Sequence, residues 1–150
     1  IQRVFTTMRE TPQHTYQLLT KRSQRLLRLS PSLDWPPNAW MGVSVESDRY
    51  CFRVDYLRQT AAQVKFVSVE PMLGPVTSLD LEGIDWVIVG GESGARARPM
   101  EQAWARSVRD LCGAGGVPFF FKQWGGHTPK AGGRLLDGLT WDEMPQPATA

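Results

Sequence analysis

The chain carries one short phrase three times, as Gly42-Val43-Ser44-Val45-Glu46-Ser47, Phe66-Val67-Ser68-Val69-Glu70-Pro71 and Ile88-Val89-Gly90-Gly91-Glu92-Ser93. Each copy is an apolar, β-branched run that ends in a glutamate, and the glutamates recur after 24 and then 22 residues. This interval fits one strand, one helix and the return to a next strand, which predicts parallel βα units. Because parallel strands all end on the same side, we expect Glu46, Glu70 and Glu92 to gather at one rim, where α/β folds place their sites.

Hydrophobic periodicity extends this alternation of strands and helices to the rest of the chain. The predicted strands are residues 14–20, 39–45, 64–69, 85–89 and 117–121. The predicted helices are residues 1–10, a short helix capped by Ser23, a helix from Ser47 or Asp48 to about residue 62, and residues 100–114. Residues 74–83 are expected to form an irregular loop or a very short helix.

These elements predict an α/β fold of five consecutive βα units whose parallel sheet is part of a (β/α) barrel. A full barrel needs about eight strands, so five cannot close, and two unpaired edges are expected to need a cover. We therefore divide the chain into a partial barrel, residues 1–124, and a C-terminal part, residues 125–150. The second part is Gly-rich, with a hairpin that turns at Asp137-Gly138 and a tail expected to be disordered after Pro145.

Composition bounds the class of protein. The 150 residues are 41% hydrophobic and 21% charged, as is usual for one globular domain, and the net charge is only +2. No apolar stretch approaches the roughly 20 residues of a membrane span, so the cytoplasm is the expected compartment and no membrane partner is expected. Cys51 and Cys112 lie far apart, which favours two small buried side chains over a disulfide or metal site. The chain opens with Ile1 inside an amphipathic pattern, which indicates a fragment of a longer protein.

Side chains alternate between the two faces of a strand, which gives the repeated phrase a direction. The valines are expected to pack under the helices, while Ser44, Glu46, Ser68 and Glu70 face the barrel lumen together with Lys122 of the last strand. Two interpretations stand side by side. The carboxylates line a polar pocket, where close approach of two of them would raise one pKa and favour acid–base chemistry. Alternatively, they pair with Lys21 and Lys122 in a buried charge network that only fixes packing.

The segment from Gly90 to Arg98 is the best candidate for a ligand-binding loop. Gly90 and Gly91 allow close backbone approach, successive amides can form an anion-binding nest, and Arg96 and Arg98 can clamp a phosphate or carboxylate. The alternative is a tight turn with solvated arginines. The pattern is not a P-loop, because no Gly-Lys-Ser/Thr follows.

Two further features have an open interpretation. Lys21, Arg22, Arg25 and Arg28 line one helix side, either as a solvated face, which the modest net charge favours, or in contact with a nucleic acid backbone. Trp124 follows the last strand, where it either stacks on a flat ligand or packs against the Gly-rich tail.

Several longer segments resemble a bacteriophage-associated, poorly characterised family that is radical-SAM-like and distantly similar to spore photoproduct lyase. The resemblance covers nearly the whole chain and is clearest in residues 11–22, 42–46, 68–75, 85–94, 98–100, 118–125, 136–138 and 141–145.

The resemblance implies S-adenosylmethionine and a [4Fe–4S] cluster as cofactors, with three cluster cysteines in a more N-terminal part of the full-length protein. Cys51 and Cys112 do not match those cysteines, so this chain resembles the C-terminal part of such a barrel. The candidate catalytic residues are Glu46, Glu70, Glu92 and Lys122, and the candidate cofactor-binding residues are Ser44, Ser68, Gly90, Gly91, Arg96 and Arg98.

The implied partner is a nucleic acid or nucleotide, and the implied cover for the sheet edges is the missing N-terminal half or a second copy of the chain. The rival hypothesis is a non-catalytic module that binds an anion, a nucleotide or another protein.

Overall fold

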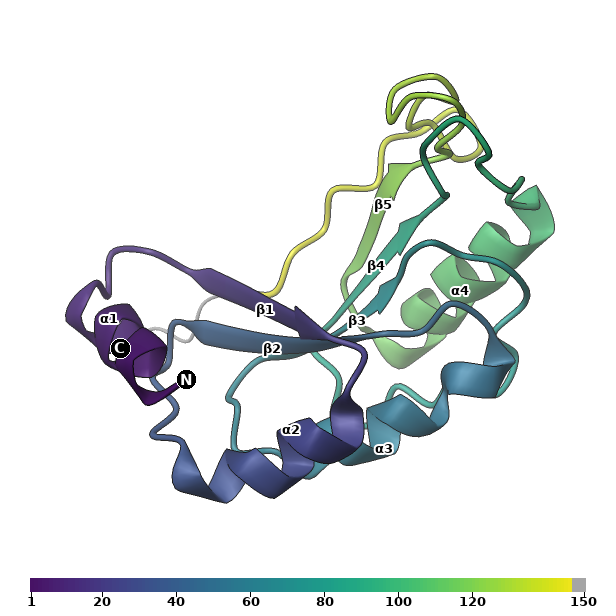
Figure 1. The fold of residues 1–150 in the computed structure, drawn as a ribbon. Coiled ribbons are helices and arrows are strands. Elements are labelled where there is room, and N and C mark those ends of the chain that lie inside the picture. The colour runs from purple at the N-terminus through teal and green to yellow at the C-terminus, as the bar shows by residue number, and fades with distance from the viewer. Residues whose placement is uncertain (147–150) are drawn as a thin grey trace.

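The computed structural model describes residues 1–146 as one open sheet with helices on one side (Figure 1). Its strands pair in sequence order, β1-β2-β3-β4-β5, and all four pairs are parallel. The elements are α1 (Gln2–Glu10), β1 (Tyr16–Thr20), α2 (Ser23–Leu29), η1 (Ser30–Ser32), β2 (Ala39–Ser44), η2 (Asp48–Tyr50), α3 (Phe52–Arg58), β3 (Lys65–Val69), β4 (Trp86–Gly90), α4 (Gln102–Gly115) and β5 (Phe119–Gln123).

Helices cover one face of this sheet. Helix α3 packs on β2 and β3, α4 packs on β4 and β5, and α2 packs beside α3. Figure 1 shows α2 and α3 side by side, with the strands turning steadily from β1 to β5 above them. We call the opposite face of the sheet, which these three helices leave free, the inner face. The α/β class and the five parallel strands are as expected from the sequence.

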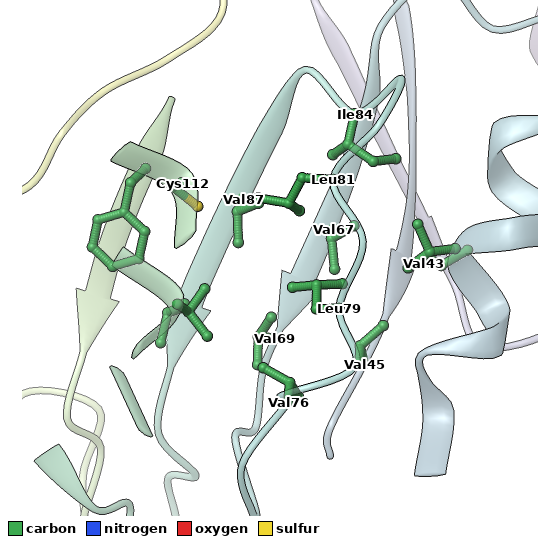
Figure 2. Packing of buried hydrophobic residues seen from close by; sticks show 14 of the residues in the cluster. Val43, Val45, Val67, Val69, Val76, Leu79, Leu81, Ile84, Val87 and Cys112 are labelled. Carbon is green, nitrogen blue, oxygen red and sulfur yellow. The ribbon is translucent and has the colours of Figure 1, made fainter. Parts of the chain in front are cut away.

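Valine side chains form the core between the sheet and the helices (Figure 2). Val43, Val45, Val67, Val69 and Val87 are fully buried there, as their alternation predicts. On the helix side they meet residues such as Leu57 of α3, and Val108 and Cys112 of α4.

The connection between β3 and β4 contains no helix, so the expected unbroken series of βα units is interrupted there. An irregular loop takes the place of the helix, which agrees with the expectation for residues 74–83. Its apolar side chains Val76, Leu79, Leu81 and Ile84 are buried in the same core. The loop is therefore a structural cover for the sheet, and Figure 2 shows these four residues facing the strand valines.

The inner face carries aromatic side chains. Trp40, Phe66 and Trp86 form a second buried cluster, and Phe120 of β5 packs beside it with its ring 5.9 Å from that of Trp86. Phe66 lies next to Gly42 in the register of β2 and β3. A Cβ atom at Gly42 would lie only 2.4 Å from the Phe66 ring, so the ring occupies the space that a side chain on β2 would otherwise fill.

The C-terminal segment covers one edge of the sheet. The Phe121 amide donates to the Trp141 carbonyl at 2.9 Å, and Phe120 and Asp142 form an antiparallel bridge. The Trp86 indole also donates to the Glu143 carbonyl at 2.8 Å. The edge of β5 is therefore covered, as the sequence leads us to expect, but the cover is the C-terminal segment of the same chain. Only the outer edge of β1 lacks a strand partner within residues 1–146.

Other sequence expectations at the C-terminus have mixed outcomes. The hairpin is confirmed, because Leu136 bridges to Leu139 and both Asp137 and Gly138 have positive φ angles. The last strand begins at Phe119, two residues later than expected, because Pro118 has no N–H to donate to a ladder. Of the tail expected to be disordered after Pro145, residues 147–150 lie outside the described residues. Within residues 1–146, every helix is too short or too polar to cross a membrane.

A substitution of Gly42 by valine tests whether the Phe66 ring needs the space above Gly42. We expect Gly42→Val to lower the free energy of unfolding by about 2 kcal/mol or more, because the Phe66 ring has to leave its position. Urea unfolding followed by far-UV circular dichroism measures the change.

The matched control is Gly113→Ala in α4, where no atom lies within 4 Å of the added Cβ. This variant should be more stable than the parent by about 0.5–1 kcal/mol, because alanine loses less backbone entropy in a helix. Equal stabilities of the Gly42→Val variant and the parent would contradict the packing argument.

Candidate functional site

The three glutamates of the repeated phrase follow the carboxyl ends of neighbouring strands, as the sequence predicts. Glu46 follows β2, Glu70 follows β3, and Glu92 follows β4. The carboxylates, however, pair with different cations: Glu46 with two, and Glu70 and Glu92 with one each. The rim is therefore a row of separate ion pairs, and within the described part of the chain no two of the three carboxylates share a cation.

Glu46 is the most buried member of the row, at 6% exposure. Its oxygens lie 2.5 Å from Lys21 Nζ and 2.9 Å from Arg53 Nη1. Burial by itself raises the pKa of Glu46, but the hydrogen bond from Lys21 and the charge of Arg53 outweigh it, and the pKa is lowered below 4.5. Glu46 thus pairs with Lys21, as in the structural interpretation, but its second partner is Arg53, and the Lys21 side chain is 57% exposed.

Arg53 holds this network in place from α3. Its Nη1 atom also donates to the Ser44 carbonyl at 2.7 Å, and its guanidinium lies 4.2 Å from the centroid of the Tyr50 ring. Ser44 itself is buried at the end of β2. Arg53 was not expected at this site, because no motif in the sequence places its side chain beside Glu46.

Glu70 and Lys122 form the ion pair that faces the inner side of the sheet. Lys122 Nζ lies 2.8 Å from one carboxylate oxygen of Glu70 and 3.1 Å from the other. The two residues come from β5 and from the end of β3, with β4 between them. Gly90 of β4 leaves room for the Glu70 side chain, because a Cβ atom there would lie 3.1 Å from Cδ of Glu70.

A pocket of about 430 Å³, which we call the inner pocket, lies on the inner face beside this ion pair. Its floor is apolar and includes Phe66, Trp86, Ile88 and Phe120, and its polar wall consists of Gln17, Ser68, Glu70 and Lys122; Leu19 and Met144 complete it.

Two of these features were not expected from the sequence. The unbroken apolar run of residues 117–121 does not show which side chain leaves the main core, and alternation along β5 turns Phe120 to the inner face. Met144 comes from the C-terminal segment, whose path across the sheet has no local signal in the sequence.

A second pocket, of about 470 Å³, lies at the rim and shares Glu70 and Lys122 with the inner pocket. Gly91, Glu92 and Ser93 of the Gly-rich loop also line it. The structure therefore brings Ser68, Glu70, Glu92, Gly91 and Lys122 around two adjoining pockets. Glu46 and Ser44 lie outside both.

The Gly-rich loop is closed by contacts within the chain. Arg98 donates to both oxygens of Glu92, at 2.8 and 2.7 Å, and its backbone amide donates to the same carboxylate at 2.9 Å. These hydrogen bonds from Arg98 lower the pKa of Glu92 to about 2. The charge of Arg98 is thus neutralised by Glu92, while Arg96 on the same loop is exposed.

Gly91 has a packing role in this loop. Its amide donates to the Gln123 carbonyl at 2.9 Å, and a Cβ atom at this position would lie 1.9 Å from the Trp124 carbonyl oxygen. Trp124 packs edge-on against Phe121 and donates from its indole to the Leu135 carbonyl. Of the two interpretations of Trp124, packing against the Gly-rich tail is therefore the one that the geometry shows.

The residues present do not fit an iron–sulfur cluster. Burial raises the pKa of Cys112 to about 12, and burial together with Asp48 raises that of Cys51 to about 11, whereas metal ligation requires thiolates. In the part of the chain that the structure describes, no three His, Cys, Asp or Glu side chains are grouped so that they could hold a metal ion.

Comparison with known proteins gives one match. Residues 1–145 match the model of a family described as "Protein of unknown function (DUF5131)". No curated protein and no solved structure matches the chain.

The buried pair of Glu46 and Arg53 can be tested by its contribution to stability. We expect Glu46→Gln to lower the free energy of unfolding at pH 7 by about 2–3 kcal/mol, because Arg53 loses its carboxylate partner while it stays buried.

The effect should depend on pH. The folded pKa of Glu46 is lowered, so its contribution is complete above the ordinary value of 4.5 and is lost as the pH falls through the folded value. Urea unfolding of both proteins between pH 3 and pH 7 checks this, with the exposed Glu82→Gln as the control. A Glu46→Gln penalty that stays constant down to pH 3 would contradict the ionised pair.

Proposed function

We propose that this chain, which belongs to the family described as "Protein of unknown function (DUF5131)", binds an adenosine-containing small molecule in the inner pocket. The single observation that carries the proposal is the ion pair of Glu70 and Lys122 at the edge of an aromatic floor. In this proposal the sheet is one wall of a radical-SAM-like barrel, and S-adenosylmethionine is the first candidate ligand.

The floor of the pocket suits a flat aromatic group. Ile88 and Phe120 are partly exposed in the pocket, and the buried rings of Phe66 and Trp86 support them from below. Small-molecule sites usually measure about 300–1,000 Å³ and combine an apolar lining with a few polar groups, and the inner pocket fits that description. An adenine ring placed there gains apolar burial and contact with the Phe120 ring.

The polar wall suits a ligand with both charges. S-adenosylmethionine ends in an ammonium and a carboxylate, which are complementary to Glu70 and Lys122 respectively. Both side chains are partly exposed, with Lys122 at 50% and Glu70 at 22%, so a ligand can reach them from the pocket. The Ser68 hydroxyl lies in the same wall and can hydrogen-bond a ribose.

The sequence resemblance to the bacteriophage-associated, radical-SAM-like family supports this choice of ligand. The cysteines of this chain do not fit the iron–sulfur cluster of that family, so we assign to these residues ligand binding and orientation only. The rival proposal, an anion site at the Gly-rich loop, has less support, because no aromatic side chain of residues 1–146 lines the pocket at that loop.

Isothermal titration calorimetry of the protein with S-adenosylmethionine, ATP and adenosine tests the proposal. We expect binding of S-adenosylmethionine, and we expect Glu70→Gln and Lys122→Met each to weaken it by at least about tenfold, equivalent to about 1.4 kcal/mol. Gly90→Val should weaken binding in the same way, because it displaces Glu70 from Lys122 without any change of charge.

Matched controls are the exposed Glu82→Gln and Lys130→Met, which lie outside the inner pocket. These variants should bind as the parent protein does. Absence of binding to all three ligands by the parent protein would reject the proposal. Unchanged affinity in Lys122→Met would reject the assigned site.

A further inference from the structure

A strongly basic groove lies between α2 and α3, outside the inner pocket. It has a volume of about 390 Å³ and is lined by Lys21, Arg22, Ser23, Gln24, Arg25, Arg28, Phe52 and Arg53. None of these residues lines the inner pocket, so the groove is a separate feature of the molecule. We infer that it binds the phosphate backbone of a single-stranded nucleic acid.

Charge is the first observation behind this inference. Five of the eight lining residues are cations and none is acidic. Two of these cations, Lys21 and Arg53, contact the carboxylate of Glu46. Five cations less one carboxylate leave four positive charges here, although the whole chain has a net charge of only +2. Positive charge is therefore concentrated at this groove, although the charges of the whole chain nearly balance.

The arginines of α2 and of its N-cap residue are free to meet a ligand. Arg22, Arg25 and Arg28 are exposed, and none of the three forms an ion pair with another residue between positions 1 and 146. Their spacing of three residues places them on neighbouring turns of one helix side. Guanidinium groups in such a row contact successive phosphate oxygens, because each presents a planar fork of N–H donors.

An exposed aromatic side chain points to single strands. Phe52, at the start of α3, is 47% exposed and lines the same groove. Tyr56 contacts it edge-on, with ring centroids 6.2 Å apart, and accepts a hydrogen bond from Gln24 of α2. The Phe52 ring is thus supported from one side and open on the other. Cations that follow the backbone beside an aromatic ring that stacks on a base are the features by which proteins bind single strands.

Fluorescence anisotropy with a fluorescein-labelled single-stranded oligothymidylate of 15 nucleotides tests this inference on the whole chain. We expect Arg25→Gln/Arg28→Gln to weaken binding at least about tenfold at 100 mM salt. Log affinity decreases as log salt increases, and each phosphate contact on a single strand contributes about 0.7 to the steepness of this slope. Because the double variant loses two contacts, we expect its slope to be shallower by about 1.4. The matched control is Arg3→Gln/Lys130→Gln, which removes the same charge from exposed residues outside the groove.

Phe52→Ala separates single-strand binding from general attraction to polyanions. It should weaken binding of the single strand at least about fivefold and leave binding of a labelled 15-base-pair duplex unchanged.

Equal losses in the two charge variants would reject the groove as the site. Equal affinity for single strand and duplex, with no effect of Phe52→Ala, would reject the single strand as the ligand. Circular dichroism melts confirm that each variant is folded, and Arg22→Gln/Arg28→Gln replaces the first pair if it is not.

Discussion

Pairing of the parallel strands β2, β3 and β4 in one register is the constraint on which the rest of the structure depends. Ser44 lies beside Ser68, and Val67 lies beside Val87. Side chains that share a face on one strand therefore lie next to side chains of the same kind on the neighbouring strand. The valines then form one buried layer against the helices and the loop of residues 74–83. A slip of one residue would turn every side chain of a strand to the other face and would place Glu70 in the valine core.

Two glycines, Gly42 and Gly90, shape the inner face because they leave space for side chains of neighbouring strands. At Gly42 the empty position is filled by the Phe66 ring from the next strand. At Gly90 the empty position lets the Glu70 side chain reach past β4 to Lys122 on β5. In the first contact the ring of β3 lies over a glycine of the neighbouring strand β2. In the second, a residue that follows β3 meets a residue of β5 across a glycine of β4, which lies between the two strands. Polar and aromatic groups therefore come together in a pocket that no single strand could build.

The distribution of charge gives the two halves of the rim different properties. At β3 and β4, Glu70 and Glu92 each pair with one cation, Glu70 beside the inner pocket and Glu92 at the rim pocket. At β1 and β2, one carboxylate, Glu46, is shared by Lys21 and Arg53, and the arginines of α2 add further positive charge. The first arrangement suits a small ligand with both charges, and the second suits a polyanion. Both lie on a chain whose overall charge is close to neutral.

The sequence by itself determined the five strands, their parallel arrangement and the rim on which Glu46, Glu70 and Glu92 lie, because β-branched alternation and the interval between strands are local properties of the chain. It also determined which face each valine takes. Only the tertiary structure decided which cation each glutamate meets, that residues 141–143 cover the edge of β5, and that the apolar side chains of the loop at residues 74–83 complete the core. The physical reason is that contacts such as Arg53 with Glu46, or Lys122 with Glu70, depend on how helices and strands pack in three dimensions. Local periodicity fixes the direction of a side chain but does not specify its partner.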